Sequence, residues 1–192
     1  GADEVLLGYD LFRETAIRRF WSRYPKSSWR GSLFKRLYVY LPQYQNPRYF
    51  KMLMDFYKPH LSDKGNPHYA MDVRWSNGIA LQSFFSGEMQ SFVSANDPVL
   101  SLNNILPAGY NKSDDIDRAQ WIEWQTLLSN YLLSSQGDRM SMAHGVESRV
   151  PFLDHEFIEF CSKSPRRIKL RGLKDKFILR KTFAKKLPKE VT

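Results

Sequence analysis

The chain has 192 residues, enough for one globular domain or for part of a larger one. Its 29 Lys and Arg residues against 20 Asp and Glu give a net charge of +9, which attracts phosphates, nucleic acid or anionic lipid without choosing among them. No signal-peptide pattern and no apolar run of membrane-spanning length is present, which speaks against a membrane protein. A single cysteine excludes an internal disulfide and fits a reducing compartment, with the cytoplasm as the default location.

The first half of the chain shows mainly helical spacing. Apolar side chains recur at helical intervals over residues 11–21, and SLFKRLYVYL (32–41) predicts a second helix with Ser32 as its cap. Pro47 in a first turn opens a third predicted helix over 47–58. Residues 59–77 lose this period and predict a long loop or an insertion, followed by short helices over 79–85 and 88–94.

The second half contains the clearest helical pattern. Its apolar stripe must bury against another element, and it consists of Trp124, Leu127, Leu128, Tyr131 and Leu132. Asp154 predicts the cap of a short helix in which Cys161 is a core residue, and a last helix ends before Pro188. Because no alternating run long enough for a sheet occurs, we expect a mainly α fold.

The segment MAHGVESRVPFLDHEF (142–157) gathers histidines and carboxylates and raises the question of an active site. A zinc peptidase needs two histidines one helical turn apart, whereas His155 lies far from His144 and Glu147. A hydrolase triad of Ser141, His144 and Asp154 has the right residue types, but the nucleophile-elbow motif is absent.

The alternative interpretation of this segment is structural. Glu147 and Arg149 lie two residues apart beside the apolar VPFL, which predicts buried or half-buried groups that are fully paired. On this interpretation the two side chains fix one loop geometry and do not react.

Three segments together resemble one family: GADEVLLGY (1–9), GDRMSMAHGVESRVPFLDHEF (137–157) and KDKFILRKTF (174–183). They are similar to the synthetase domain of glutamine-dependent asparagine synthetases, the ATP-pyrophosphatase branch shared with β-lactam synthetase. The resemblance runs along the whole chain except residues 59–111, which match no known motif and form a possible insertion or a subfamily-specific region. It implies that residues 1–192 are the helical C-terminal part of an α/β domain of the adenine nucleotide alpha-hydrolase type.

In that family, ATP activates a side-chain carboxylate as an acyl-adenylate with release of pyrophosphate, and glutamine-derived ammonia then forms an amide. The resemblance implies ATP and Mg²⁺ as cofactors, because a divalent cation neutralises the leaving pyrophosphate. It implies that Asp3 binds this Mg²⁺ through the pyrophosphate and that Lys176 is the catalytic residue against the phosphates. Glu4 and Tyr9 match positions near the nucleotide and the acyl pocket.

The sequence also singles out Lys176 by position. With Leu179, Phe183 and Leu187 it lies on the stripe of the last predicted helix that faces inward, so it is snorkelling, paired or catalytic. A buried partner carboxylate is the structural alternative. The resemblance further implies five residues that support the substrate cleft: Asp138, Arg139, Glu147, Arg149 and Asp154.

Two parts of the family pattern do not occur in this sequence: the phosphate loop SGGxDS and the N-terminal cysteine of the glutaminase domain. We therefore expect a fragment, inactive alone, whose partners are the N-terminal part of the same protein, a small-molecule acid and glutamine. Homodimer formation stays open. Aspartate is the default acceptor, but the unmatched residues 59–111 leave amidation of a different acid open.

A basic helical nucleic-acid module is the rival from another class of protein. Aromatic residues make up 15% of the chain and mix with basic ones in RRFWSRYPKSSWR (18–30), and PRRIKLRGLKDK (165–176) is strongly basic. Helical stripes already account for many of these rings as core, and no recognised binding motif occurs. The sequence therefore does not favour nucleic acid as a partner.

Overall fold

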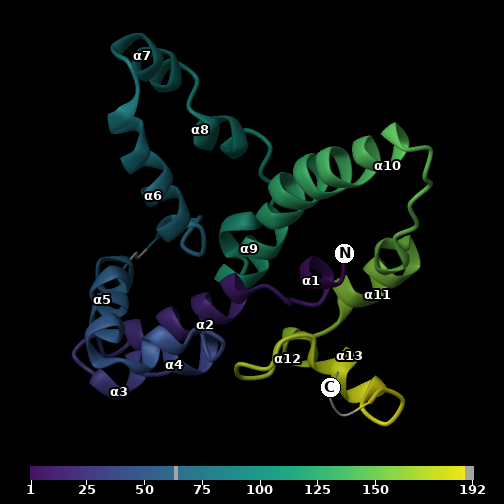
Figure 1. Ribbon diagram of the computed structural model, residues 1–192, viewed down its shortest axis with the longest axis horizontal. Helices are drawn as coiled ribbons and strands as arrows, with labels where there is room; N and C mark the ends of the chain where they lie inside the picture. The colour runs from purple at the N-terminus through teal and green to yellow at the C-terminus, as the bar shows by residue number, and fades with distance from the viewer. Residues whose placement is uncertain (63–64, 189–192) are drawn as a thin grey trace.

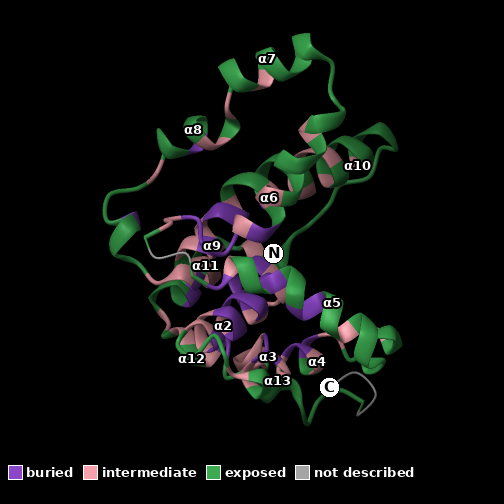
Figure 2. Cartoon of the chain, turned by 90° about the vertical axis from the view of Figure 1, so that its left-hand side faces the viewer, coloured by how far each residue is buried: buried purple, intermediate pink, exposed green. Residues whose placement is uncertain are grey.

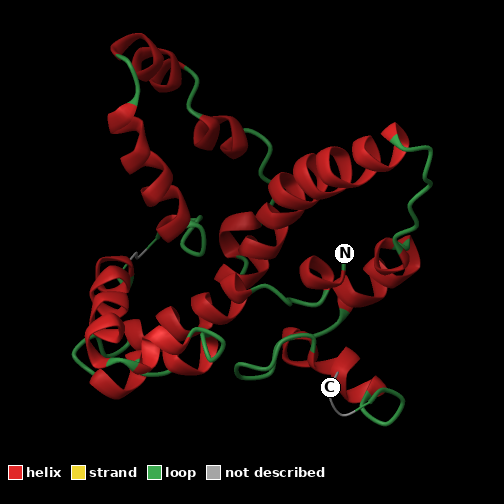
Figure 3. Cartoon of the chain, in the orientation of Figure 1, coloured by secondary structure: helices red, strands yellow, loops and turns green. Residues whose placement is uncertain are grey.

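The computed structural model describes residues 1–62 and 65–188, and within these ranges it consists of helices and loops without a β-strand (Figure 3). Arg171 and Lys174 form an isolated antiparallel bridge. The prediction of a mainly α fold is confirmed. None of the helices in the described ranges has the length and apolar character needed to cross a membrane.

The elements follow one another as labelled in Figure 1. The first part contains α1 (Ala2–Val5), α2 (Asp10–Ser22), α3 (Ser28–Gly31), α4 (Phe34–Leu37), the 3-10 turn η1 (Pro42–Gln45), α5 (Pro47–Tyr57) and η2 (Lys58–His60). The middle contains α6 (Asp72–Leu81), η3 (Gln82–Phe84), α7 (Gly87–Ala95), α8 (Pro98–Asn103) and η4 (Tyr110–Lys112). The last part contains α9 (Asp115–Glu123), the π-helix η5 (Trp124–Asp138), α10 (Arg139–Ala143), η6 (Pro151–Leu153), α11 (His155–Lys163), α12 (Arg166–Lys169) and α13 (Phe177–Phe183).

Helices α2, α5 and α11 agree with the sequence prediction, and side-chain caps define the starts of α5 and α11. The side chain of Asn46 accepts from the Arg48 amide at 2.9 Å and starts α5, and Asp154 accepts from the Phe157 amide at 3.1 Å and starts α11. The helix predicted over 32–41 is confirmed only over α4, and its bounds and its cap are wrong. Ser27, not Ser32, caps the short α3, and the backbone leaves the helical region at Tyr38, where α4 ends.

The loop predicted over 59–77 is wrong in its second part, since α6 starts at Asp72. Tertiary contacts order this segment: His68 is buried, and its ring nitrogens contact the Tyr110 hydroxyl at 3.2 Å and the Asn103 side chain at 2.7 Å. Because long-range contacts of this kind order the segment, the sequence needs no local helical period here, and the apolar pattern alone does not predict the structure.

Helices α6, α7 and α8 form an arm that projects from the body of the molecule (Figure 1), and Figure 2 colours most of α7 and α8 as exposed. Leu102 anchors the end of α8 in the core. Large apolar side chains along the arm are exposed, including Ile79, Leu81, Phe84, Phe85, Met89, Phe92 and Leu100. Such a surface is typical of an interaction site, but nothing in the structure shows what covers it.

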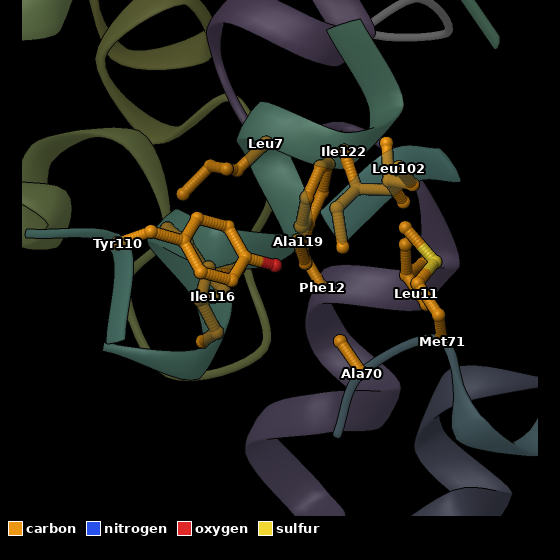
Figure 4. Close-up of a cluster of buried hydrophobic side chains, with 11 residues drawn as sticks. Leu7, Leu11, Phe12, Ala70, Met71, Leu102, Tyr110, Ile116, Ala119 and Ile122 are labelled. Atoms are coloured by element: carbon orange, nitrogen blue, oxygen red, sulfur yellow. The ribbon is translucent and has the colours of Figure 1, made fainter. Parts of the chain in front are cut away.

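The core consists of three apolar clusters. The first joins α2, α9 and the ends of the arm (Figure 4), and it contains Leu7, Leu11, Phe12, Ala70, Met71, Leu102, Tyr110, Ile116, Ala119, Ile122 and Leu170. The second lies between α2, α4 and α5 around Trp21, Phe34 and Tyr57. The third joins Val5 and Leu6 to Cys161, so the prediction that the cysteine is a core residue is confirmed.

The predicted stripe over residues 124–132 is buried only in part. Leu128 is 8% exposed, but Tyr131 is 49% exposed. The residues lie in the π-helix η5, where Trp124, Leu127 and Leu132 are half-buried. The residues between them, Gln125, Thr126, Ser129 and Asn130, are exposed. The expectation that this stripe buries against another element is therefore confirmed except at Tyr131, and Trp124 packs on the third cluster.

Arg18 organises the junction between α2 and the residues before α6. It is fully buried and donates to the His60 carbonyl at 2.7 Å and to the Tyr69 carbonyl at 3.1 Å, and its guanidinium lies 4.2 Å from the Tyr69 ring centroid. Glu14 lies one turn earlier, 3.7 Å from this guanidinium. Burial raises the pKa of the Glu14 carboxyl, and Arg18 opposes that rise.

We predict that Arg18→Met lowers the free energy of unfolding by about 3 kcal/mol or more, because it leaves two carbonyls and a buried carboxylate without a cation. Urea unfolding followed by circular dichroism measures this change. The control is Arg23→Met, since Arg23 is exposed one turn further along the chain. A loss at Arg18 no larger than that at Arg23 would contradict the role of the buried arginine.

Asp114 joins three helices at one carboxylate. It caps α9 by accepting from the Ile116 amide at 3.0 Å, and it pairs with Arg19 of α2 and Arg166 of α12. Burial raises the pKa of the Asp114 carboxyl, but the hydrogen bond from the backbone amide and the two guanidinium groups lower it by more. The pKa of Asp114 is therefore lowered overall. The carboxylate thus orients α9 relative to both neighbours.

We predict that Asp114→Asn destabilises the protein by about 1–2 kcal/mol at pH 7, through the lost cap charge and the two arginine contacts. Because the folded pKa is lowered, this stabilisation is present above the unfolded value near 3.8 and is lost as pH falls through the folded pKa. Thermal unfolding from pH 7 to pH 2 should show the two proteins converging at acid pH. A constant difference would contradict the ionic part of this role.

Candidate functional site

The candidate site is built around α1 and the turn that follows it. Glu4 is fully buried, and both of its carboxylate oxygens are engaged: Oε1 accepts from the Tyr9 hydroxyl at 2.6 Å, and Oε2 lies 2.8 Å from the Gly1 nitrogen. The second contact has the geometry of a capping box, in which the third residue of a helix reaches back to its start. Glu4 therefore stabilises the start of α1, and its other oxygen orients the Tyr9 hydroxyl, which lies nearer the surface.

Tyr9 lies at the edge of this arrangement and is partly buried. Burial raises the pKa of its phenol, and the hydrogen bond to the Glu4 carboxylate raises it further. The hydroxyl consequently stays protonated at neutral pH and acts as a donor.

The structure brings Asp3 and Lys176 together, although they lie at opposite ends of the sequence. Lys176 Nζ is 2.7 Å from Asp3 Oδ1, with side chains that are 23% and 39% exposed. The Lys176 amide also donates to the Leu6 carbonyl at 3.2 Å. Lys176 thus has a carboxylate partner, as the alternative to catalysis expected, but this partner is partly exposed and not buried.

Lys176 does not lie within the last helix, as its predicted stripe implied. It precedes α13 with a left-handed backbone (φ 46°), and α13 ends at Phe183. Phe183 and Leu187 are exposed, so the inward stripe is wrong beyond Leu179, which packs on the third cluster. The left-handed backbone at Lys176 directs its side chain toward Asp3 of α1 instead.

Gly8 makes the approach of Asp3 and Lys176 possible. A Cβ at this position would lie 2.1 Å from Asp3 Oδ1 and 2.2 Å from Lys176 Cε, far closer than van der Waals contact. The glycine is therefore required by the space that the ion pair occupies, and the sequence signal for it is the Gly-Tyr step after α1.

Helix α9 packs against α1 and holds it by hydrogen bonds from one side chain. Gln120 Nε2 donates to the carbonyls of Glu4 at 2.6 Å and Val5 at 3.0 Å, and Lys169 Nζ approaches Gln120 Oε1 at 3.4 Å. Burial lowers the pKa of Lys169. Sequence reasoning missed Gln120 and Lys169, since neither belongs to a motif that distinguishes it from any other polar helical residue.

The five predicted cleft residues do not contact Asp3 or Lys176 in the part of the chain that the structure describes. Asp138 and Arg139 are exposed where η5 meets α10, and Asp154 caps α11. Glu147 and Arg149 pair with each other at 2.7 Å, but their side chains are 75% and 78% exposed. The expectation that these two groups are buried or half-buried is therefore wrong for this structure.

The segment 142–157 approaches the site through an apolar residue. Leu153 of η6 lies against Gly1, where an added Cβ would meet it at 3.0 Å, and it packs on the third cluster with Val5. Ser141 bonds to the Ser148 hydroxyl at 2.8 Å rather than to His144 or Asp154. Among the described residues no group of three or more His, Cys, Asp or Glu side chains is arranged to hold a metal ion.

Comparison with known proteins gives a consistent result. The sequence model of the asparagine synthase family matches residues 1–192. The chain is 26% identical to the glutamine-hydrolysing asparagine synthetase 1 of Bacillus subtilis over 196 aligned residues, which cover 100% of this chain and 28% of that protein. No solved structure gives a significant match.

Two further relatives match shorter parts. Human glutamine-hydrolysing asparagine synthetase is 36% identical over 87 residues, covering 43% of this chain and 15% of the human protein. An amidase of Gibberella zeae is 39% identical over 62 residues, covering 32% of this chain and 9% of the amidase. The chain thus spans well under a third of the length of each of these relatives.

We predict that Gly8→Ala separates Asp3 from Lys176 beyond hydrogen-bonding distance, because the new methyl group needs the space of both side chains. The free energy of unfolding should change by about 1 kcal/mol or less, since a partly exposed ion pair contributes little to stability. A crystal structure measures the separation. Gly87→Ala is the control, as nothing lies within 4 Å of its added Cβ. An intact ion pair in Gly8→Ala would contradict the requirement for glycine.

Proposed function

Because the chain belongs to the asparagine synthase family, we propose that it is the helical C-terminal part of a longer ATP-dependent ligase. The observation that carries the proposal is the contact between Asp3 and Lys176, which gathers a carboxylate and a cation from two separate family motifs. The full-length protein, which we call the parent, would supply the phosphate loop and a glutaminase domain. Names of relatives that include glutamine hydrolysis support this organisation.

The proposed reaction has two steps. A carboxylate attacks the α-phosphate of ATP, forming an acyl-adenylate and releasing pyrophosphate, and glutamine-derived ammonia then displaces AMP to form the amide. Both steps create negative charge on oxygen that a nearby cation stabilises. Lys176 is the proposed catalytic residue for this purpose, because its ammonium group is partly exposed and held in one position by Asp3.

The residues present fit a magnesium ion bound through pyrophosphate. Mg²⁺ takes one or two carboxylates and completes its coordination with phosphate oxygens and water, and Asp3 offers a partly exposed carboxylate. When bound, the ion neutralises the leaving pyrophosphate. Asp3 would turn from Lys176 toward the cation, which frees the lysine ammonium for a phosphate oxygen.

Tyr9 and Glu4 are proposed to line the nucleotide-binding side of the site. Tyr9 is the member of this pair with access to a ligand, since Glu4 is fully buried behind it. The phenol keeps its proton and its orientation through the Glu4 carboxylate, so it can present a fixed polar edge.

The exposed cleft residues are proposed to act in the parent. Asp138, Arg139, Glu147, Arg149 and Asp154 remain proposed supports of the substrate cleft. Their exposure suits a surface that another part of the parent covers. The exposed Glu147–Arg149 ion pair offers both of its charges to such a neighbouring part.

Aspartate is the proposed acceptor, in line with the asparagine synthetases among the relatives. Amidation of a different acid stays the alternative, and the relative named as an amidase shows that similar sequences occur in proteins named for other amide chemistry. We also propose a cytoplasmic location for the parent, in keeping with the free thiol of Cys161. Homodimer formation stays a proposal without a structural argument.

The rival nucleic-acid function receives less support. In the aromatic and basic segment 18–30, Trp21 is a core residue, and Arg30 lies 4.1 Å from the ring centroids of both Phe20 and Tyr24. The mixture of rings and cations therefore serves internal packing in large part.

We predict that the parent exchanges pyrophosphate into ATP in the presence of its acceptor acid and that Lys176→Ala lowers this rate by at least about a hundredfold, because a charge-stabilising cation is lost. The matched control is Lys181→Ala, an exposed lysine on α13. Radiolabelled pyrophosphate measures the exchange. A normal rate in correctly folded Lys176→Ala would show that the lysine has no catalytic role.

A further inference from the structure

Glu123 is a buried carboxylate that the proposed reaction does not use. It lies at the end of α9, is 3% exposed, and its Oε2 atom has no hydrogen-bond partner. A buried ionised group without full pairing is costly, so such a residue needs an explanation beyond packing.

The position of Glu123 connects it to the site. It lies three residues after Gln120, on the same side of α9, and Gln120 holds the carbonyls of Glu4 and Val5. Across this junction the Glu4 carboxylate raises the pKa of Glu123, and the Glu123 carboxylate contributes to the raised pKa of Tyr9. Helix α9 therefore holds α1, which carries Asp3, through the Gln120 amide, and Glu123 lies on the same side of α9 less than one turn further along the chain.

The cation that faces Glu123 comes from the arm. Arg74 of α6 places Nη1 at 3.3 Å from Glu123 Oε1, and its own side chain is 49% exposed. Burial raises the pKa of Glu123, Arg74 lowers it, and Glu4 raises it again. The pKa of Glu123 in α9 thus depends on Arg74 in α6, the first helix of the arm.

We propose that Glu123 is a positioning residue for the Asp3–Lys176 site and that its ion pair with Arg74 holds it in place at the junction of α9 and α6, so that residues 59–111 support the reaction instead of forming a passive insertion. The inference rests on the proposed function, and it assigns neither residue a contact with substrate. Loss of the cation would leave a buried carboxylate that either takes up a proton or moves away from α6. Either response would shift α9 and with it the Gln120 side chain that bonds to the carbonyls of α1.

The test uses the full-length parent and its rate of ATP–pyrophosphate exchange as a function of pH. Arg74→Gln should move the acidic limb of kcat to higher pH, because the pKa of Glu123 rises without its cation. Arg74→Lys keeps the charge and should restore the limb. Glu123→Gln should remove that limb and lower kcat by about tenfold, as is common for outer-shell partners of a site, with the KM for ATP changed less than about twofold.

Glu156→Gln is a matched control, since Glu156 is an exposed glutamate on α11. Near-ultraviolet circular dichroism establishes that each variant is folded, and a misfolded Glu123→Gln leaves the Arg74 pair of variants as the test. An acidic limb that is the same in the parent, in Arg74→Gln and in Glu123→Gln would overturn this inference while leaving the proposed function intact. A parent without any exchange would overturn the proposed function and this inference with it.

Discussion

The support that α9 gives to α1 is the interaction on which the candidate site depends. A four-residue helix has no stability of its own in water, because one helical turn does not repay the entropy of forming it. Gln120 holds α1 by its carbonyls, and Asp114 fixes the start of α9 between α2 and α12. The geometry of Asp3 and Lys176 is therefore a property of the packed helices rather than of the motif that contains the aspartate.

The ion pair itself contributes little to stability and much to chemistry. A carboxylate and an ammonium group that are both partly exposed gain only a small net energy from their contact. A ligand can reach both groups because they are partly exposed. Each group can therefore change its partner when a phosphate and a cation bind. Gly8 keeps the space between them free of a side chain, and the left-handed backbone at Lys176 turns its side chain toward α1.

Apolar surface is distributed unevenly over this chain. The three clusters bury the faces of α2, α9 and α5, whereas the arm and the segment around α10 present large apolar side chains to solvent, among them Phe84 and Met142. The matched region covers 28% of the Bacillus subtilis relative, and in the longer parent that we propose other segments would cover such surfaces. The exposed cleft residues lie on one of these surfaces, which is the reason that their proposed role concerns the parent.

The sequence by itself determined the helical class, the ends of α5 and α11, the core position of Cys161 and the family, because these depend on caps, apolar spacing and motif order within short stretches. The tertiary structure decided the rest. It shortened the predicted helix over 32–41 to α4 and ordered the residues before α6 around the buried His68, since long-range packing outweighs weak local preference. It also decided that Lys176 meets Asp3 and that Glu123 faces Arg74, because no local pattern encodes which distant side chains share a site.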